Sequence, residues 1–113
     1  MKIIDLQPSP EKQIRFHLRL EKDVPTAAGC YALVSFDFVV LYIGLSKNLL
    51  RRFREHLDCK EKIMPTQDGK AFWFYYRLCE ENDLEMLERT WLKIACDMDG
   101  RRPILNCVDS PVS

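Results

Sequence analysis

Two β-rich segments joined by a very short connection restrict what this chain can fold into. Residues 30–36 and 39–44 are dominated by β-branched and aromatic side chains, and only Asp37 and Phe38 lie between them. Segments of this composition, so close together, predict an antiparallel hairpin. Gly44 ends the second segment, and a helical pattern begins soon afterwards. The hairpin should therefore pass almost directly into a helix.

The register of this hairpin decides whether two tyrosines lie side by side. A two-residue turn pairs Phe36 with Val39 and Leu33 with Tyr42. Tyr31 lies two residues before Leu33, so its ring would share a face with the ring of Tyr42. A three-residue turn would place the rings on opposite faces, and the sequence leaves both registers open.

The segment after the hairpin has the pattern of an amphipathic helix with basic flanks. Ser46 or Asn48 is a suitable N-cap. At about 100° per residue, one face of the helix is apolar, and Arg52 and His56 lie one turn apart on one flank of it. The apolar face consists of Leu49, Leu50, Phe53 and Leu57, and the opposite flank carries Lys47, Arg51 and Arg54.

Two further segments predict strands, and a polar stretch precedes the second of them. Residues 13–20 alternate strictly between apolar and polar side chains, which indicates a half-buried strand at a sheet edge. His17 falls on the polar face of that strand. Residues 70–79 carry aromatic side chains on both faces and should be covered on both. Residues 58–70 are polar and include proline and glycine, so a loop is expected there.

A second, longer helix carries a carboxylate on the side that should face the core. This helix should run from a cap at Asn82 or Asp83 to Gly100. On a helical wheel Glu88 falls inside the apolar arc, and Glu85 lies at its edge. A carboxylate there is costly unless it is paired, protonated or bound to a metal. Two interpretations remain open: a glutamate that reaches water or an arginine, and a functional group facing a cleft. The arc is formed by Leu84, Leu87, Trp91, Leu92, Ile94, Ala95 and Met98.

These elements fit one small α+β domain that spans residues 1–113. We expect a small antiparallel sheet of three to four strands flanked by helices, in the order β-β-β-α-β-α. Residues 1–24 form an extension with the edge strand, and residues 25–107 form the core. No apolar run approaches the roughly 20 residues that span a bilayer, and the N-terminus lacks the apolar core of a signal peptide. A cytoplasmic location without membrane contact is therefore expected.

Charge and cysteine usage exclude several functions. The chain has 17 basic and 17 acidic residues, which argues against strong non-specific binding to nucleic acid, although a local basic patch can still bind. Its 5 cysteines contain no C-x-x-C pair, so neither a disulfide framework nor a zinc site is expected. We expect reduced cysteines that mostly fill the core: Cys30, Cys59, Cys79, Cys96 and Cys107.

Several short motifs follow one another along residues 25–107. Gly29-Cys30-Tyr31 is followed, after residues 32–41, by Tyr42-Ile43-Gly44. Together with the residues after them, in this order and spacing, these motifs resemble the GIY-YIG nuclease superfamily. Leu45 departs from the pattern, because repair-type relatives carry a lysine there. The remaining matches are Ser46, Asn48, Leu49, Arg52, His56, Glu88, Trp91-Leu92-Lys93, Pro103 and Asn106.

The resemblance implies a metal-dependent endonuclease that hydrolyses phosphodiester bonds in DNA. Glu88 would hold Mg²⁺, with Mn²⁺ as a substitute, and Arg52 would bind a phosphate. A tyrosine would act as general base, with its pKa lowered by the metal and by Arg52 and His56. His56 would orient a phenol or bind phosphate, and Asn106 would hold the surrounding residues in place. The implied catalytic residues are Tyr31, Tyr42, Arg52, His56, Glu88 and Asn106, and the sequence does not decide which phenol is the base.

Other functions remain open beside a stand-alone DNA endonuclease. One is a non-catalytic nucleic-acid-binding or assembly module of the same fold. Another is a catalytic subunit recruited by a separate DNA-reading protein, and the chain could also form a homodimer. No segment is left over for the DNA-binding module that many members of the superfamily append. DNA contacts are therefore expected from the short basic cluster Lys47, Arg51, Arg52 and Arg54.

Overall fold

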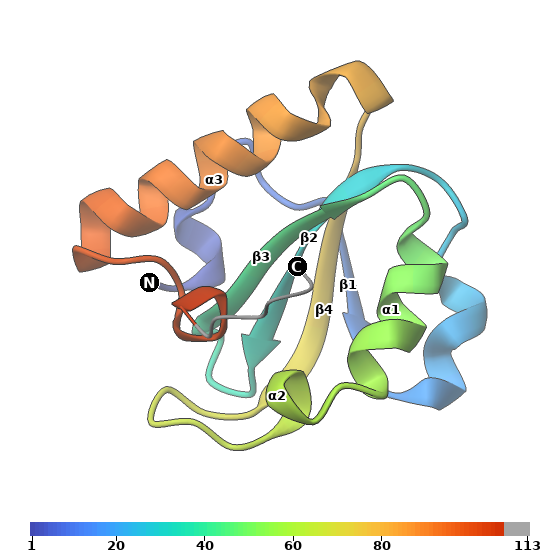
Figure 1. Cartoon of the computed structure of the whole chain (residues 1–113), viewed down its shortest axis with the longest axis horizontal. Coiled ribbons are helices and arrows are strands. Elements are labelled where there is room, and N and C mark those ends of the chain that lie inside the picture. Colours follow the sequence, from blue (N-terminus) through green and yellow to red (C-terminus); the bar gives the residue numbers. More distant parts are fainter. Residues whose placement is uncertain (108–113) are drawn as a thin grey trace.

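A four-stranded antiparallel sheet forms the centre of the computed structural model, which describes residues 1–107 (Figure 1). The strands lie side by side in the order β1-β4-β2-β3, so β4 and β2 are the inner strands. This confirms the predicted α+β class and its small antiparallel sheet. The strands are β1 (Lys12–Arg15), β2 (Gly29–Ser35), β3 (Val40–Ser46) and β4 (Ala71–Leu78).

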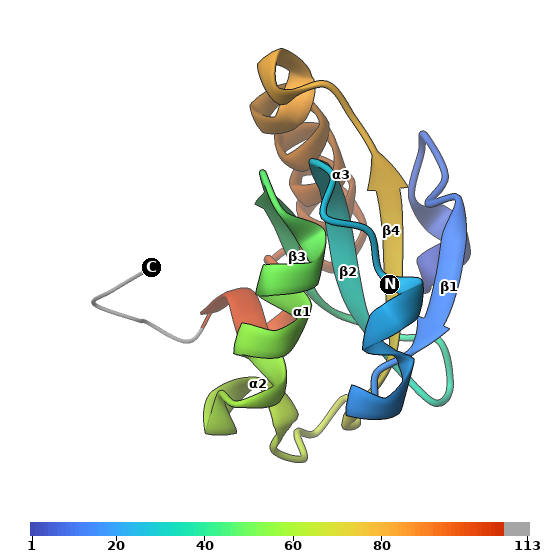
Figure 2. The same ribbon diagram turned by 90° about the vertical axis from the view of Figure 1, so that its right-hand side faces the viewer.

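Helices cover both faces of the sheet (Figures 1 and 2). The long helix α3 (Leu84–Asp99) packs on one face, against β2 and β3. The helix α1 (Leu49–Leu57) and the 3₁₀ helix η2 (Leu18–Asp23) pack together over the other face. The shorter elements are α2 (Lys60–Ile63) and the 3₁₀ helices η1 (Ile3–Asp5), η3 (Glu81–Asp83) and η4 (Ile104–Cys107).

Strand β2 divides two hydrophobic clusters because its side chains alternate between the faces. Cys30, Ala32 and Val34 belong to the cluster under α3, whereas Tyr31 and Leu33 belong to the cluster under α1. All residues of β2 are buried, which explains why this segment reads as a continuous apolar run. Strand β2, which carries the Gly29-Cys30-Tyr31 motif, is therefore packed on both of its faces.

The turn between β2 and β3 is the longer of the two alternatives that the sequence leaves open. The Ser35 N–H donates to the Val39 carbonyl oxygen at 2.9 Å, and the Phe38 N–H donates to the Ser35 carbonyl oxygen at 2.9 Å. Val39 is therefore opposite Ser35, and the pair of Phe36 with Val39 that a two-residue turn would make does not form. Phe38 has a φ of 69°, an unusual value for a side chain other than glycine, which closes the turn.

A register shift next to this turn restores the predicted arrangement of the tyrosines. Val34 pairs with Val40, but Leu33 pairs with Tyr42, as predicted, because one residue of β3 is bulged between them. Tyr31 consequently shares a face with Tyr42, and their ring centroids are 6.0 Å apart. The bulge is the reason why a longer turn does not separate the two rings.

The N-terminal strand is shorter than predicted. It pairs with β4 alone, which confirms an edge strand, but it ends at Arg15. The chain then enters η2, so the prediction that Leu18 and Leu20 continue a strand is wrong. His17 is exposed, as expected, and its Nδ1 accepts a hydrogen bond from the Arg19 N–H at 3.1 Å. This bond caps η2 and turns the chain away from the sheet.

The helix boundaries follow local capping. Asn48, not Ser46, caps α1: its Oδ1 accepts a hydrogen bond from the Arg51 N–H at 3.0 Å. Gly100 ends α3 with a φ of 73°. The segment expected to be a loop contains α2, and Met98, predicted on the apolar arc of α3, is 54% exposed. Met98 lies in the last turn of α3, beyond the part of the helix that packs on the sheet, and α2 is a short helix packed beside α1.

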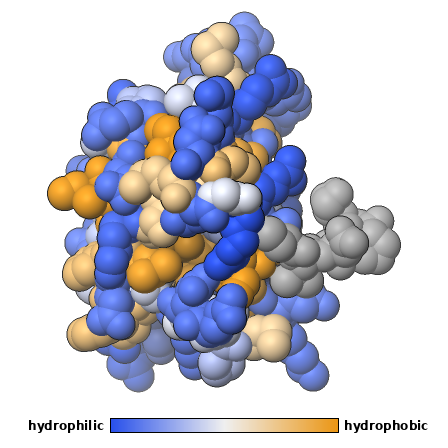
Figure 3. All heavy atoms as spheres, turned by 90° about the vertical axis from the view of Figure 1, so that its left-hand side faces the viewer, coloured by the Kyte–Doolittle hydropathy of each residue, from blue (hydrophilic) through white to orange (hydrophobic). Residues whose placement is uncertain are grey.

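The four cysteines whose side chains the structure describes are free thiols, as expected, but most of these four do not fill the core. Cys30 is buried, Cys59 and Cys79 are partly exposed, and Cys96 is exposed. The side chain of Cys107 lies outside the described part of the structure. On the face shown in Figure 3, hydrophobic side chains are interspersed with hydrophilic ones. No helix within the described residues is long and apolar enough to cross a membrane.

Candidate active site

One cleft collects side chains from distant parts of the sequence. It has a volume of about 890 Å³ and is lined by residues of β2, β3, α1, α2, α3 and η4. All of the residues predicted to be catalytic line it: Tyr31, Tyr42, Arg52, His56, Glu88 and Asn106. Glu88 faces this cleft and lies within electrostatic reach of Arg102, so both interpretations left open by the sequence agree with its position.

Tyr31 and His56 form a buried pair at the floor of this cleft. The Tyr31 hydroxyl and His56 Nε2 are 2.5 Å apart. Burial lowers the pKa of His56 to about 3, and repulsion from Lys62 and Arg52 adds to this shift. The imidazole is therefore neutral near pH 7 and can accept the phenol proton as a hydrogen bond. The expectation that His56 supplies positive charge to the phenols is wrong for this environment.

Burial holds both phenols in the protonated state. It raises the pKa of Tyr31 well above the usual value, with a further contribution from Tyr42. Burial also raises the pKa of Tyr42, although Tyr31 and the Arg52 guanidinium oppose the shift. The residues of the cleft therefore do not by themselves lower the phenol pKa values as predicted. Any such lowering requires charge brought in by a bound metal or another group.

Gly44 allows the ring of Tyr31 to lie against β3. A Cβ atom at this position would be 2.5 Å from the Tyr31 hydroxyl oxygen and 2.9 Å from Cε2 of Tyr42. Real Cβ contacts are essentially never that short, so any other residue would displace one of the rings. The glycine that ends the Tyr42-Ile43-Gly44 motif is therefore needed for packing of the two phenols.

Asn106 fastens the outer edge of β3, which has no neighbouring strand. Its Oδ1 accepts a hydrogen bond from the Ile43 N–H at 2.8 Å, and its Nδ2 donates to the Ile43 carbonyl oxygen at 2.9 Å. These two bonds replace the ladder that another strand would make. Because Ile43 lies between Tyr42 and Gly44, these two bonds hold the second motif in position.

Arg52 extends from α1 into the cleft with part of its hydrogen-bonding capacity unused. Its Nη1 is 3.2 Å from Oε2 of Glu55, while its Nε is buried and has no partner among the described residues. A buried donor without a partner is costly. A phosphate oxygen is the kind of acceptor that a guanidinium binds with several of its donors.

Glu88 is a half-buried carboxylate on the wall formed by α3. Burial raises its pKa above the ordinary value; Arg102 opposes this shift and Glu85 adds to it. No ion pair between Glu88 and another described residue is found. An unpaired carboxylate beside phosphate-binding groups suits Mg²⁺, which keeps several waters and also binds phosphate. Within residues 1–107 there is no cluster of three or more metal-binding side chains, so Glu88 would be the main protein ligand.

The basic cluster predicted to contact DNA is divided by the structure. Arg52 reaches the cleft, whereas Lys47, Arg51 and Arg54 lie outside its lining. Arg54 Nε is 2.9 Å from Oε2 of Glu21, and Arg51 Nε is 3.5 Å from Oε1 of Glu55. These outer cations are thus partly neutralised by nearby carboxylates.

The structure adds cleft residues that the sequence did not indicate. Lys62, on α2, has its Nζ 4.1 Å from the centroid of the Tyr42 ring. Arg89, Arg102 and Glu85 also line the cleft. The sequence does not indicate Lys62 as a cleft residue, because its segment has the pattern of a loop. One lysine among several in a polar stretch does not point to a functional site.

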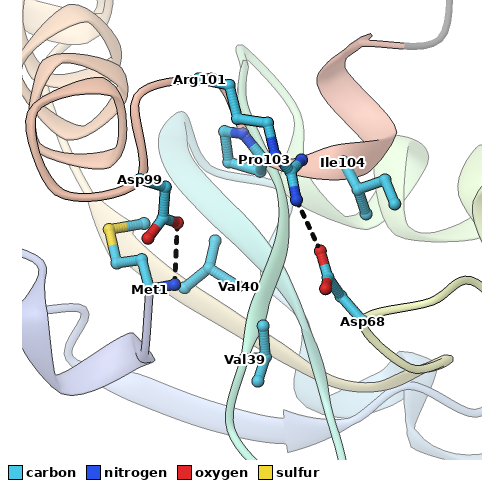
Figure 4. A pocket seen from close by; sticks show the side chains of 8 residues that line it. All are labelled: Met1, Val39, Val40, Asp68, Asp99, Arg101, Pro103 and Ile104. Atoms are coloured by element: carbon cyan, nitrogen blue, oxygen red, sulfur yellow. Dashed lines mark hydrogen bonds and ion pairs between the residues drawn. The ribbon is translucent and has the colours of Figure 1, made fainter.

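A second, smaller hollow of about 250 Å³ lies beside the N-terminus and the end of α3 (Figure 4). The Met1 ammonium is 2.8 Å from Oδ2 of Asp99, and Arg101 Nη2 is 3.1 Å from Oδ2 of Asp68. Each cation thus has a carboxylate partner, and none of the predicted catalytic residues lines this hollow. Its ion pairs fasten segments far apart in the sequence.

Sequence comparison relates the chain to a short part of several proteins described as UvrABC system protein C. No protein-family model matches the chain. It is 37% identical over 59 residues to the UvrABC system protein C of Synechococcus sp. (strain CC9311), and 33% identical over 75 residues to that of Porphyromonas gingivalis (strain ATCC BAA-308 / W83). These matches cover 52% and 62% of this chain, but only 9% and 12% of the relatives.

Structure comparison finds solved domains of similar fold. The fold is similar to that of the GIY-YIG N-terminal endonuclease domain of UvrC from Thermotoga maritima, in a point mutant bound to its catalytic divalent cation. The TM-score is 0.51 at 20% identity, and the match covers 80% of this chain and 93% of that one. A second point mutant of the same domain gives the same TM-score, with 99% of its chain covered.

Proposed function

We propose that this chain, which has the GIY-YIG endonuclease fold, is a metal-dependent endonuclease that hydrolyses phosphodiester bonds in DNA. One observation carries the proposal: two phenols, an imidazole, a guanidinium and an unpaired carboxylate line a single cleft. Phosphodiester hydrolysis needs a base for the attacking water, charge stabilisation at phosphorus and help for the departing oxygen. The cleft offers a group for each of these tasks.

Phosphate binding is assigned to Arg52, and metal binding to Glu88. The buried Arg52 Nε, which has no partner among the described residues, would donate to an oxygen of the scissile phosphate. A divalent cation held by Glu88, Mg²⁺ with Mn²⁺ as a substitute, would supply positive charge near the phosphate and the departing oxygen. Asn106 would act as a positioning residue, through its two bonds to Ile43.

Proton transfer is assigned to the Tyr31–His56 pair. With a raised pKa, the Tyr31 phenol alone is a weak base at neutral pH because it is protonated. Its hydroxyl is 2.5 Å from the neutral His56 Nε2. The negative charge of a bound phosphate would raise the low pKa of His56, and Tyr31 would then pass its proton to this nitrogen while its oxygen accepts a proton from the attacking water. Tyr42 would then border the phosphate site and would not be the base.

A non-catalytic nucleic-acid-binding module of the same fold is the second candidate. It is favoured by the raised pKa of both phenols, which leaves the cleft without an ionised phenol to act as base. In that case Arg52 would bind phosphate but no DNA would be cleaved. The proton transfer from Tyr31 to His56 would then take part in no reaction.

A cleavage assay distinguishes the two functions. The purified chain is incubated with supercoiled, branched and single-stranded DNA in the presence of Mg²⁺, Mn²⁺ or EDTA. An endonuclease should cut at least one of these DNA forms with the divalent ions and none in EDTA. Binding without cutting under every condition would favour the non-catalytic module, and equal cutting in EDTA would contradict a metal-dependent mechanism.

A further inference from the structure

Lys62 places a second positive charge in the candidate active site. Its ammonium lies over the face of the Tyr42 ring, 4.1 Å from the centroid. The same ammonium donates a hydrogen bond to the Leu105 carbonyl oxygen at 3.4 Å. Among the described residues no carboxylate forms an ion pair with it. The side chain is thus held at the edge of the cleft by contacts that leave its charge unneutralised.

The charge of Lys62 adds to that of Arg52 around the same imidazole. Both cations disfavour protonation of His56, so both lie within electrostatic reach of it. They come from different helices, Lys62 from α2 and Arg52 from α1. Glu55 neutralises only part of the Arg52 guanidinium. Two cations gathered about a neutral ring in a partly buried space repel each other, and a bound anion would relieve that repulsion.

Lys62 also has hydrogen-bonding capacity left for a ligand. An ammonium group has three N–H donors. One donates to Leu105, and the contact with the Tyr42 ring satisfies the side of the ammonium that faces the ring. At least one donor remains for an acceptor in the cleft. Lysine binds phosphate as a compact point charge, which complements the planar donors of arginine.

We propose that Lys62 and Arg52 together form a two-cation site for a backbone phosphate of nucleic acid, with Lys62 as a phosphate-binding residue supplied by α2. This inference rests on the proposed function only in taking nucleic acid as the ligand; it does not require cleavage. It assigns α2 the task of closing the phosphate site beside Tyr42. The proposal also predicts that the charge of the Lys62 side chain, not its length, accounts for its contribution to phosphate binding.

Binding measurements without metal test this proposal. A short fluorescein-labelled DNA duplex is titrated in EDTA at several salt concentrations with the wild type and with Lys62→Met, whose apolar stem can still cover Tyr42. Lys60→Met is the matched control, because Lys60 is an exposed lysine on the same helix. Losing one phosphate contact should reduce the slope of log K against log salt by about 0.9. Lys60→Met should keep the wild-type slope, and Lys62→Arg should restore it.

The outcomes separate this inference from the proposed enzyme function. A reduced slope for Lys62→Met, with restoration by Lys62→Arg, supports the phosphate site even if no DNA is ever cut. An unchanged slope for Lys62→Met overturns it, even if the wild type is an active nuclease. If Lys62→Met melts at a lower temperature than the wild type, Lys62→Gln takes its place and is judged by the same slopes.

Discussion

At the scale of single residues, the cleft keeps its groups in unusual states by removing them from water. Burial raises the pKa of Glu88 and lowers that of His56 to about 3, so each group is biased toward its neutral form. The folded chain therefore holds a carboxylate at a cost that metal binding would offset. Residues with strongly shifted pKa values in a cleft are typical of functional sites.

Removing the Glu88 carboxylate should not weaken the metal-free fold. We predict that Glu88→Ala melts in EDTA at the wild-type temperature or higher, because a poorly compensated buried charge is lost. A thermal melt followed by circular dichroism checks this, with Glu85→Ala as the control on the same helix. Glu88→Ala melting at a markedly lower temperature in EDTA would make Glu88 a structural anchor, since breaking a structural ion pair typically costs about 3–5 kcal/mol.

The buried imidazole makes stability depend on pH in a defined direction. His56 has a pKa of about 3 when folded and an ordinary value of 6.5, so below pH 6.5 the unfolded chain binds a proton that the folded chain does not. Folding stability should therefore fall as the pH drops from 6.5 toward 3, by a few kcal/mol in all, at about 1.4 kcal/mol per pKa unit.

Urea unfolding at pH 7 and pH 4.5 measures this effect. The wild type should lose more free energy of unfolding between the two pH values than His56→Gln, which carries no titrating group at that position. His17→Gln is the control, because His17 is exposed, and it should behave like the wild type. An equal loss in the wild type and His56→Gln would show that His56 is not held neutral.

At the scale of secondary-structure elements, β3 is the strand on which the site depends. It carries Tyr42 and Gly44, and its free edge is fastened by the side chain of Asn106 in η4. The bulge next to the β2–β3 turn sets which face its residues occupy. The 3₁₀ helix η4 and the bulge in β3 thus determine the positions of the Tyr31 and Tyr42 rings.

Asn106→Ala should destabilise the fold and disturb the site together. Two hydrogen bonds to Ile43 are lost and its N–H is left without its partner, which should cost about 1–3 kcal/mol. Urea unfolding checks the stability, with Asn82→Ala as an exposed control. A wild-type free energy of unfolding for Asn106→Ala would mean that water replaces these bonds fully, and that Asn106 does not hold β3.

The sequence predicts those parts of the structure that follow from periodicity and motif spacing. The existence of the β2–β3 hairpin, the position of α3 and the position of Glu88 on the inner side of that helix all follow from alternation or from the helical wheel. The bulge in β3 does not, because it depends on how the turn packs against the sheet. The same holds for Lys62, whose place in the cleft results from a four-residue helix stabilised by tertiary contacts.

At the scale of the whole molecule, a chain without net charge brings cations and carboxylates together in one cleft. The chain carries 17 basic and 17 acidic residues, and outer cations such as Arg54 are paired with carboxylates. A small charged cleft without a wider basic surface can position a phosphate but gives little total attraction to DNA. Recruitment by a separate DNA-reading protein is therefore compatible with this surface.

The isolated chain should accordingly bind DNA weakly and in a salt-sensitive manner. We predict dissociation constants of about 10⁻⁴–10⁻⁶ M, the range of non-specific contacts at physiological salt. Fluorescence anisotropy on duplexes of unrelated sequence, at low and high salt, measures both properties. The opposite result would be tight binding that resists added salt and discriminates between DNA sequences. It would show that a surface outside the cleft recognises DNA sequence.

The most direct test of the account is whether cleavage of DNA requires a divalent cation and the Glu88 carboxylate. Nicking of supercoiled plasmid is measured for the wild type, Glu88→Gln and Glu85→Gln, each in Mg²⁺ and in EDTA. Both glutamates line the same cleft on the same helix, so the comparison isolates the assigned ligand. We predict nicking by the wild type and Glu85→Gln in Mg²⁺ alone, and none by Glu88→Gln. Nicking by Glu88→Gln at the wild-type rate, or by the wild type in EDTA, would contradict a metal-dependent mechanism that uses the Glu88 carboxylate.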